Sequence, residues 1–134
     1  TFEVLRGVAH PWHCDHFGHV NVRHYAPFFD DSSYQLFAIL GIDYERMLAE
    51  HGVHTVSAQA TTKFLKELVP GDPFVIRGRI ARVGTKSVTF HFVMSHVATG
   101  EAHAEYELVD VFFDPKTRAS APMPDAVRAI LEAA

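Results

Sequence analysis

The sequence lacks the features that define several large classes of protein. A single cysteine excludes an internal disulfide and is typical of a reducing compartment. No apolar run approaches the roughly 18 to 20 residues that are needed to span a bilayer. Lysine and arginine number 12 against 16 aspartate and glutamate residues, so the net charge of −4 offers no basic surface to nucleic acid. These absences predict a cytoplasmic protein that binds neither nucleic acid nor membrane.

The composition that is present suits one ordered domain. A chain of 134 residues is long enough to bury a core without disulfides or structural metals. Hydrophobic residues make up 48% of it, with eleven phenylalanines, which indicates a globular fold. No internal repeat or low-complexity stretch interrupts the sequence, so we expect residues 1–134 to form a single domain.

The stretch from His10 to Leu40 carries most of the chemical information. Its first half is a loop rich in groups that transfer protons or bind metals, and its second half has the pattern of one apolar helix. Asn21 is the predicted N-cap of this helix, and Gly41 is a natural C-terminal stop. Because the helix is apolar nearly all round, we expect it to be buried on most sides.

The remaining sequence has mainly the two-residue period of strands. We expect one strand over residues 1–9 and four strands within residues 53–113, with short helices over residues 42–51 and 122–134. Short turns join the last four strands, which predicts that consecutive strands pair antiparallel. Only a curled sheet can cover the long helix. The predicted fold class is therefore α+β, an antiparallel sheet of about five strands wrapped around one long central helix.

Three short motifs occur in order along the chain. They are Asp15-x-x-Gly18-His19-Val20-Asn21-x-x-x-Tyr25 before the helix, Leu65-x-x-x-x-x-Gly71-Asp72 at a turn, and Gly84-x-Lys86-Ser87 at the start of a strand. With the order of elements, they resemble the hotdog-fold acyl-CoA thioesterases, most closely the 4-hydroxybenzoyl-CoA thioesterase-like family. The resemblance covers essentially the whole chain. It implies a homodimer or homotetramer in which two sheets join edge to edge, with active sites at the subunit boundary.

The resemblance also implies roles for individual residues. Asp15 falls on the family's catalytic carboxylate, which attacks the thioester carbonyl or activates water. The backbone N–H around Val22 falls on the donor to the oxyanion, and Asp30 falls where related enzymes often carry a helix glutamate. Many members place a histidine seven residues after the catalytic aspartate, where this chain has Val22. Its own candidate is His19, four residues after Asp15, as in the plant acyl-carrier-protein thioesterases.

The residues themselves support similar chemistry. A carboxylate at Asp15, beside a helix N-terminus, is held ionised by the helix dipole, and helix-start amides can donate to an oxyanion. Gly18 permits the tight turn that brings Asp15 back over the helix end. The structural alternative is an Asx turn, in which Asp15 and Asn21 only satisfy loop amides. His19 either polarises the carbonyl or serves as a hydrogen-bonded spacer.

Substrate binding adds further candidates. The phosphates of CoA need cations, and among the available lysines and arginines we assign Arg79 and Lys86. Tyr25 is a candidate for the acyl pocket together with Phe28, Phe29 and Phe64. The predicted substrate-binding residues are Gly18, Asn21, Tyr25, Asp30, Arg79 and Lys86. The sequence does not distinguish CoA from an acyl carrier protein as the carrier of the acyl group.

Two other functions compete with thioester hydrolysis. The first is a metal site, because six possible ligands stand close together: His10, His13, Cys14, Asp15, His16 and His19. No HExxH or paired CxxC spacing supports it. The second is a hotdog protein that binds acyl-CoA or an acyl carrier without cleaving it. We predict an acyl-CoA thioesterase that needs no metal and no cofactor, since coenzyme A is part of the substrate.

Overall fold

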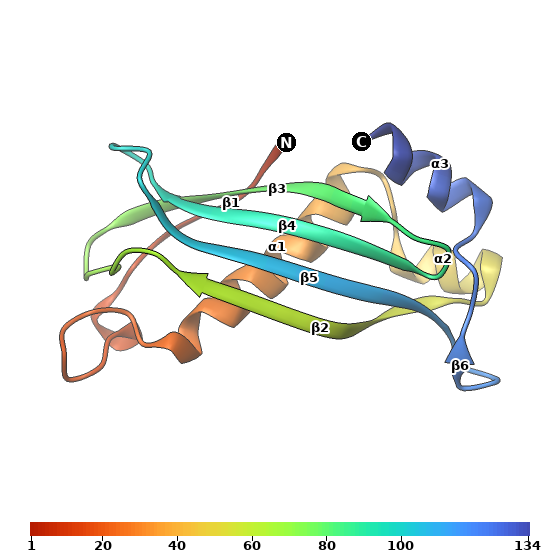
Figure 1. The fold of residues 1–134 in the computed structure, drawn as a ribbon, viewed down its shortest axis with the longest axis horizontal. Coiled ribbons are helices and arrows are strands. Elements are labelled where there is room, and N and C mark those ends of the chain that lie inside the picture. The colour runs from red at the N-terminus through yellow and green to blue at the C-terminus, as the bar shows by residue number, and fades with distance from the viewer.

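The computed structural model describes all residues, Thr1–Ala134, and shows an antiparallel sheet curled around one long helix (Figure 1). The helix is α1, Tyr25–Ile39. The strands are β1 Phe2–Val8, β2 His54–Phe64, β3 Pro73–Val83, β4 Ser87–His96 and β5 Ala102–Asp114, with a short β6, Ala119–Ser120, beside the end of β5. The predicted α+β class is confirmed, and β6 is an addition to it.

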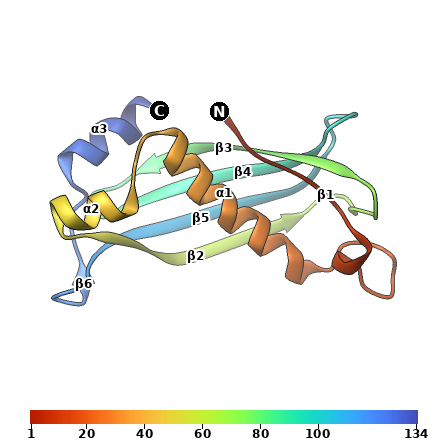
Figure 2. The same ribbon diagram turned by 180° about the vertical axis from the view of Figure 1, so that it is seen from behind.

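Helix α1 lies across the concave face of the sheet (Figure 2). Phe29 stacks on Tyr106 of β5 with ring centroids 4.6 Å apart, and Phe37 lies 5.3 Å from Phe90 of β4. The opposite side of the helix is open, and Tyr34 is exposed there. The prediction that α1 is buried on most sides was therefore wrong for the single chain, because one curled sheet covers only one side of a helix.

The order of strands across the sheet is β1-β3-β4-β5-β2. Neighbours along the chain pair as expected for β3 with β4 and for β4 with β5. The expectation was wrong for β2 and β3, because β2 pairs with β5 at the far edge. The connection from Leu65 to Asp72 therefore crosses the end of the sheet. There it meets the loop after β1, and the Val20 N–H donates to the Leu68 carbonyl at 2.7 Å.

Two short helices complete the fold. The Asp43 side chain caps α2, Tyr44–His51, by accepting from two backbone amides, and Gly52 ends it with a positive φ of 68°. Helix α3, Asp125–Ala133, buries two side chains, Val127 and Leu131. None of the helices combines the length and the apolar composition that crossing a bilayer requires.

Strand β2 forms one edge of the sheet and pairs with β5 on one side only. It is 11 residues long and mostly exposed, including the apolar side chains of Val56 and Phe64. The opposite edge strand, β1, is 7 residues long and its pairing shifts register between Glu3 and Leu5. An unpaired edge can accept another strand, and β2 is the longer of the two edges.

Candidate active site

The loop between β1 and α1 closes on itself as a tight hairpin. Cys14 and Val20 form an antiparallel bridge at its base. At its tip the Gly18 N–H donates to the Asp15 carbonyl at 3.1 Å, with Gly18 at φ 85°. A side chain is strained in this left-handed region, so glycine suits the position. The turn expected at Gly18 is present, and it brings Asp15 to Asn21 at the start of the 3₁₀ turn before α1.

Both carboxylate oxygens of Asp15 accept a hydrogen bond. The Phe17 N–H donates to Oδ1 at 2.9 Å, which is the Asx turn considered above, and the Asn21 side-chain amide donates to Oδ2 at 3.1 Å. The Phe17 N–H lowers the pKa of Asp15 most, desolvation opposes it, and the Asn21 donor and the charges of His19 and His16 lower the pKa further. Asp15 is therefore an oriented carboxylate that is ionised at neutral pH.

Asn21 joins this carboxylate to the start of the helix. Its side-chain Oδ1 accepts from the Arg23 N–H at 3.1 Å and from Arg23 Nε at 3.2 Å. Asn21 caps the 3₁₀ turn Val22–His24, whereas α1 itself begins at Tyr25 behind His24. Asn21 is therefore a cap, as predicted, but it caps a 3₁₀ turn that precedes α1 and not α1 itself.

Val22 follows Asn21 and has a free backbone amide. Its N–H is the first of the 3₁₀ turn, where no preceding turn supplies an acceptor, and it has no hydrogen-bond partner in the chain. The residue is 62% exposed. An ionised carboxylate and an available amide donor therefore stand at the same loop, joined through Asn21.

A pocket of about 220 Å³ opens beside this loop. Its lining consists of His19, Val20, Val22, Tyr25, Phe64, Leu65, Lys66 and Glu67. Tyr25 is buried and its ring meets that of Phe64 edge to face, with centroids 5.1 Å apart. Burial raises the pKa of Tyr25, so its hydroxyl stays protonated. We call this space the candidate pocket.

The candidate pocket brings together three of the predicted residues, namely His19, Val22 and Tyr25. Phe64, a candidate for the acyl pocket, also lines it. Sequence reasoning missed Glu67 and missed that the segment Leu65–Glu67 forms one wall. The only signal for that wall was the second motif, which begins at Leu65.

Other predicted residues lie elsewhere in this chain. Asp30 is an exposed residue of α1, and its charge adds to the effect of burial in raising the pKa of Asp110. Arg79 is exposed on β3 opposite His91, and Lys86 is in the β3–β4 turn, at the end of the sheet opposite the loop (Figure 1). Phe28 and Phe29 pack within the core region and do not line the candidate pocket.

The clustered histidines mostly contact one another. The His10 ring stacks on Trp12 at 4.2 Å, and the His10 N–H donates to Nδ1 of His13 at 3.0 Å. Burial lowers the pKa of His13, and the nearby His24 and His10 lower it further. No three of the His, Cys, Asp and Glu side chains are arranged to hold a metal ion. The structure therefore contains no set of ligands in this loop that would support the metal hypothesis.

Removing the Asn21 side chain tests the electrostatics of the site. We expect Asn21→Ala to raise the pKa of Asp15 toward its ordinary value, because one donor to the ionised form is lost. The carboxyl then protonates at a higher pH, so any function of the anion is lost sooner on acidification. Titration of the Asp15 carboxyl carbon by NMR measures this. An unchanged pKa in the variant contradicts the expected role of Asn21.

Comparison with known proteins places this geometry in context. The chain matches the family model of the thioesterase-like superfamily over residues 9–131. Among solved structures it superposes on YbaW from Escherichia coli, a probable thioesterase, with a TM-score of 0.84 and 20% identity, over 98% of this chain and 97% of that chain. No curated protein sequence matches the chain.

Two further solved structures are similar. One is Slr0204, a 1,4-dihydroxy-2-naphthoyl-CoA thioesterase from Synechocystis, with a TM-score of 0.82 and 12% identity over 95% of this chain and 93% of that one. The other is SAV2348 from Staphylococcus aureus in complex with CoA, with a TM-score of 0.86 and 17% identity over 96% and 80%. The expected hotdog fold is confirmed by these superpositions together with the family match.

Proposed function

The chain belongs to the thioesterase-like superfamily and is a thioester hydrolase, and we propose that its substrate is an acyl-CoA, cleaved to a free acid and CoA. The observation that carries this proposal is the pairing of an ionised carboxylate at Asp15 with the free amide of Val22, bridged by Asn21. The CoA complex of the similar protein from Staphylococcus aureus supports CoA as the carrier.

The proposed reaction uses the two groups in sequence. The Val22 N–H donates to the thioester carbonyl oxygen as negative charge develops on it. An oxygen nucleophile adds to the carbonyl carbon. The carbon–sulfur bond then breaks, and the sulfur leaves with the bonding electron pair as the CoA thiolate. Water supplies the oxygen of the product acid and the proton that the thiolate takes up. His19 lines the candidate pocket together with Val22, and in our proposal it orients the carbonyl.

In our proposal, a carboxylate oxygen of Asp15 is the nucleophile that attacks the thioester carbon. Its lowered pKa makes it a weak general base at neutral pH, since general bases work best with a pKa near the operating pH. The same property keeps it ionised and available as a nucleophile. We therefore favour attack by Asp15 on the thioester carbon, followed by hydrolysis of the mixed anhydride.

Cations for the CoA phosphates are scarce at the candidate pocket. Lys66 is the one lysine or arginine in its lining, and it pairs with Glu101 at 2.6 Å. Arg79 and Lys86 do not reach this pocket from their positions in the same chain. Their proposed contact with CoA therefore requires a second subunit.

We propose that the second subunit joins along β2. Antiparallel pairing of two β2 strands extends the sheet and satisfies the unpaired edge. It also reverses one chain relative to the other, so the Phe64 end of one strand lies toward the His54 end of its partner. The candidate pocket of one subunit then faces the α1 side that carries Asp30 in the other. Sedimentation at twice the 15.0 kDa chain mass tests this assembly.

A thiol-release assay over a panel of acyl-CoAs tests the proposed function. We expect at least one aryl, short-chain or long-chain acyl-CoA to release free thiol in proportion to enzyme. Chelator is included in a parallel series and is expected to leave the rate unchanged. Saturable binding of acyl-CoA with no thiol release over the whole panel instead supports the non-catalytic acyl-CoA binding protein.

A further inference from the structure

One wall of the candidate pocket is thin and exposed on both sides. Residues 65–67 line the candidate pocket and also a second cavity of about 600 Å³ behind it. All three are exposed, and even Leu65 is 52% exposed, so apolar packing does little to hold them in place. The position of this wall therefore depends on its hydrogen bonds.

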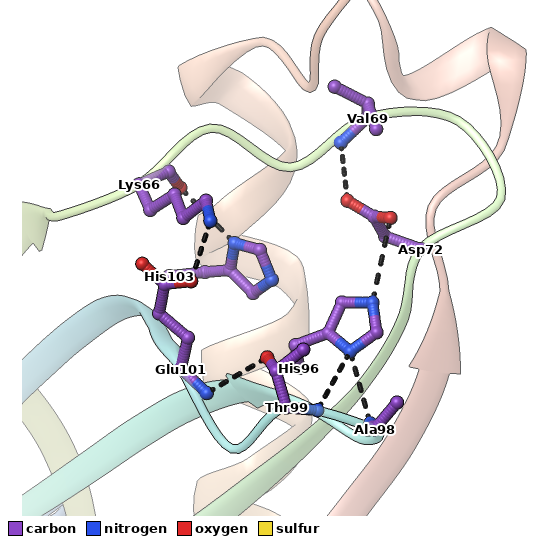
Figure 3. Close-up of polar contacts among 8 residues, drawn as sticks. All are labelled: Lys66, Val69, Asp72, His96, Ala98, Thr99, Glu101 and His103. Atoms are coloured by element: carbon purple, nitrogen blue, oxygen red, sulfur yellow. Dashed lines mark hydrogen bonds and ion pairs between the residues drawn. The ribbon is translucent and has the colours of Figure 1, made fainter.

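His103 of β5 makes those hydrogen bonds, and Figure 3 shows the contact of its ring with Lys66. Its backbone carbonyl accepts from the Leu65 N–H at 2.9 Å and from the Lys66 N–H at 3.1 Å. Its ring Nδ1 lies 3.3 Å from the Lys66 carbonyl oxygen. A carbonyl can only accept, so this contact is a hydrogen bond only when the ring proton is on Nδ1 and the ring donates to Lys66.

The other ring nitrogen shows what this arrangement costs. His103 is only 2% exposed, and its Nε2 is the single fully buried side-chain nitrogen or oxygen that lacks a hydrogen-bond partner. A buried acceptor without a donor is unfavourable. An apolar side chain avoids this cost but leaves the Lys66 carbonyl without the ring donor. The useful atom of His103 is therefore Nδ1.

The wall is also connected to the loop between β1 and α1, which carries Asp15. Leu68 is buried directly after the wall, and its carbonyl accepts from the Val20 N–H at 2.7 Å. Val20 lies between the Gly18 turn and the free amide of Val22. A shift of the wall therefore changes both the width of the pocket and the support of the loop.

We propose that His103 is a positioning residue, which holds the Leu65–Glu67 wall at the distance from Val22 and Tyr25 that the substrate requires. This inference rests on the proposed function, because it takes the candidate pocket as the substrate site. The ring acts through the Lys66 carbonyl and touches neither the substrate nor the reacting atoms.

A matched pair of variants tests the proposal. Asparagine and leucine have nearly the same shape, but only asparagine offers an N–H close to the position of Nδ1. We expect His103→Leu to raise KM about three- to tenfold, the worth of one neutral hydrogen bond, with kcat within about twofold. Amide hydrogen exchange at Leu65 and Lys66 is expected to accelerate by a similar factor. His103→Asn should stay close to the wild type in both measurements.

Glu50→Gln is the control, because it removes an exposed ion pair with Arg46 on α2, outside the wall and the candidate pocket, and leaves His103 intact. We expect it to change neither KM nor the exchange rates. Equal effects of the leucine and asparagine variants overturn the proposal. The exchange measurement needs no substrate. A difference in exchange without any turnover therefore refutes the proposed function and leaves the positioning role standing.

A measurement on the wild-type protein covers the case in which His103→Leu does not fold. Long-range proton–nitrogen correlation by NMR assigns the tautomer of each histidine ring. We expect the His103 proton on Nδ1. A proton on Nε2 overturns the proposal, because the ring then cannot donate to Lys66.

Discussion

Asp15→Asn is expected to lower kcat for acyl-CoA hydrolysis by about a hundred- to ten-thousandfold, the usual contribution of a positioned acid–base group. An amide is neither ionised nor an effective nucleophile, so neither route through Asp15 remains open. The Asn side-chain oxygen still accepts from the Phe17 N–H, so the turn is retained. The variant loses the hydrogen bond that Asn21 donates to Oδ2 of Asp15. Because this site is only partly buried, the melting temperature should change little.

Asp31→Asn is the matched control for this change. Asp31 is an exposed carboxylate on α1 and has no hydrogen bond or ion pair through its side chain. The same change of charge there should leave kcat and KM unchanged. Thiol release under saturating acyl-CoA, with circular dichroism for the fold, measures both variants. Turnover of Asp15→Asn close to that of Asp31→Asn contradicts a catalytic role for Asp15.

Val22→Pro is expected to lower kcat by about a hundred- to a thousandfold, because it deletes the proposed oxyanion donor. Proline removes the backbone N–H, which has no partner in the chain, and replaces the valine side chain by its ring. The backbone suits the change. Val22 opens a 3₁₀ turn, where proline is favoured, and Asn21 before it has φ −71° and ψ 145°, the conformation that precedes proline. The fold should therefore persist.

Val22→Ala separates the amide from the side chain. It shortens the side chain that lines the pocket but keeps the N–H, so we expect a change in KM without the large loss of kcat. Comparison of kcat between the proline and alanine variants isolates the oxyanion donor. If the two variants have similar kcat values and the proline variant is folded, another group stabilises the oxyanion.

Local features of the site followed directly from the sequence. The turn at Gly18 and the cap at Asn21 depend on residues a few positions apart, and the structure contains both. The start of the α-helix was placed one turn too early, because the apolar period continues through Val22 and does not distinguish a 3₁₀ turn from an α-helix. The free amide of Val22 follows from that same turn.

Long-range features did not follow. The period of two in β2 and β3 says that both are strands, but the alternation of side chains is the same whichever strand lies beside them. Because β2 and β3 are close in sequence, we predicted that they pair. Only the folded sheet shows that β2 lies next to β5. The wall at Leu65–Glu67 and its support by His103 depend on that placement, since a different neighbour for β2 takes the segment to another part of the molecule.

The sequence by itself determined the elements of this protein, the tight turn that carries Asp15, and the motifs that identify the family. These depend on backbone preferences, capping and periodicity, which act between residues close in the chain. The tertiary structure decided which strand became the free edge, which residues complete the candidate pocket, and that Asp30, Arg79 and Lys86 lie outside it. Those outcomes depend on the pairing of strands far apart in sequence, where the whole sheet and its packing on α1 select one arrangement.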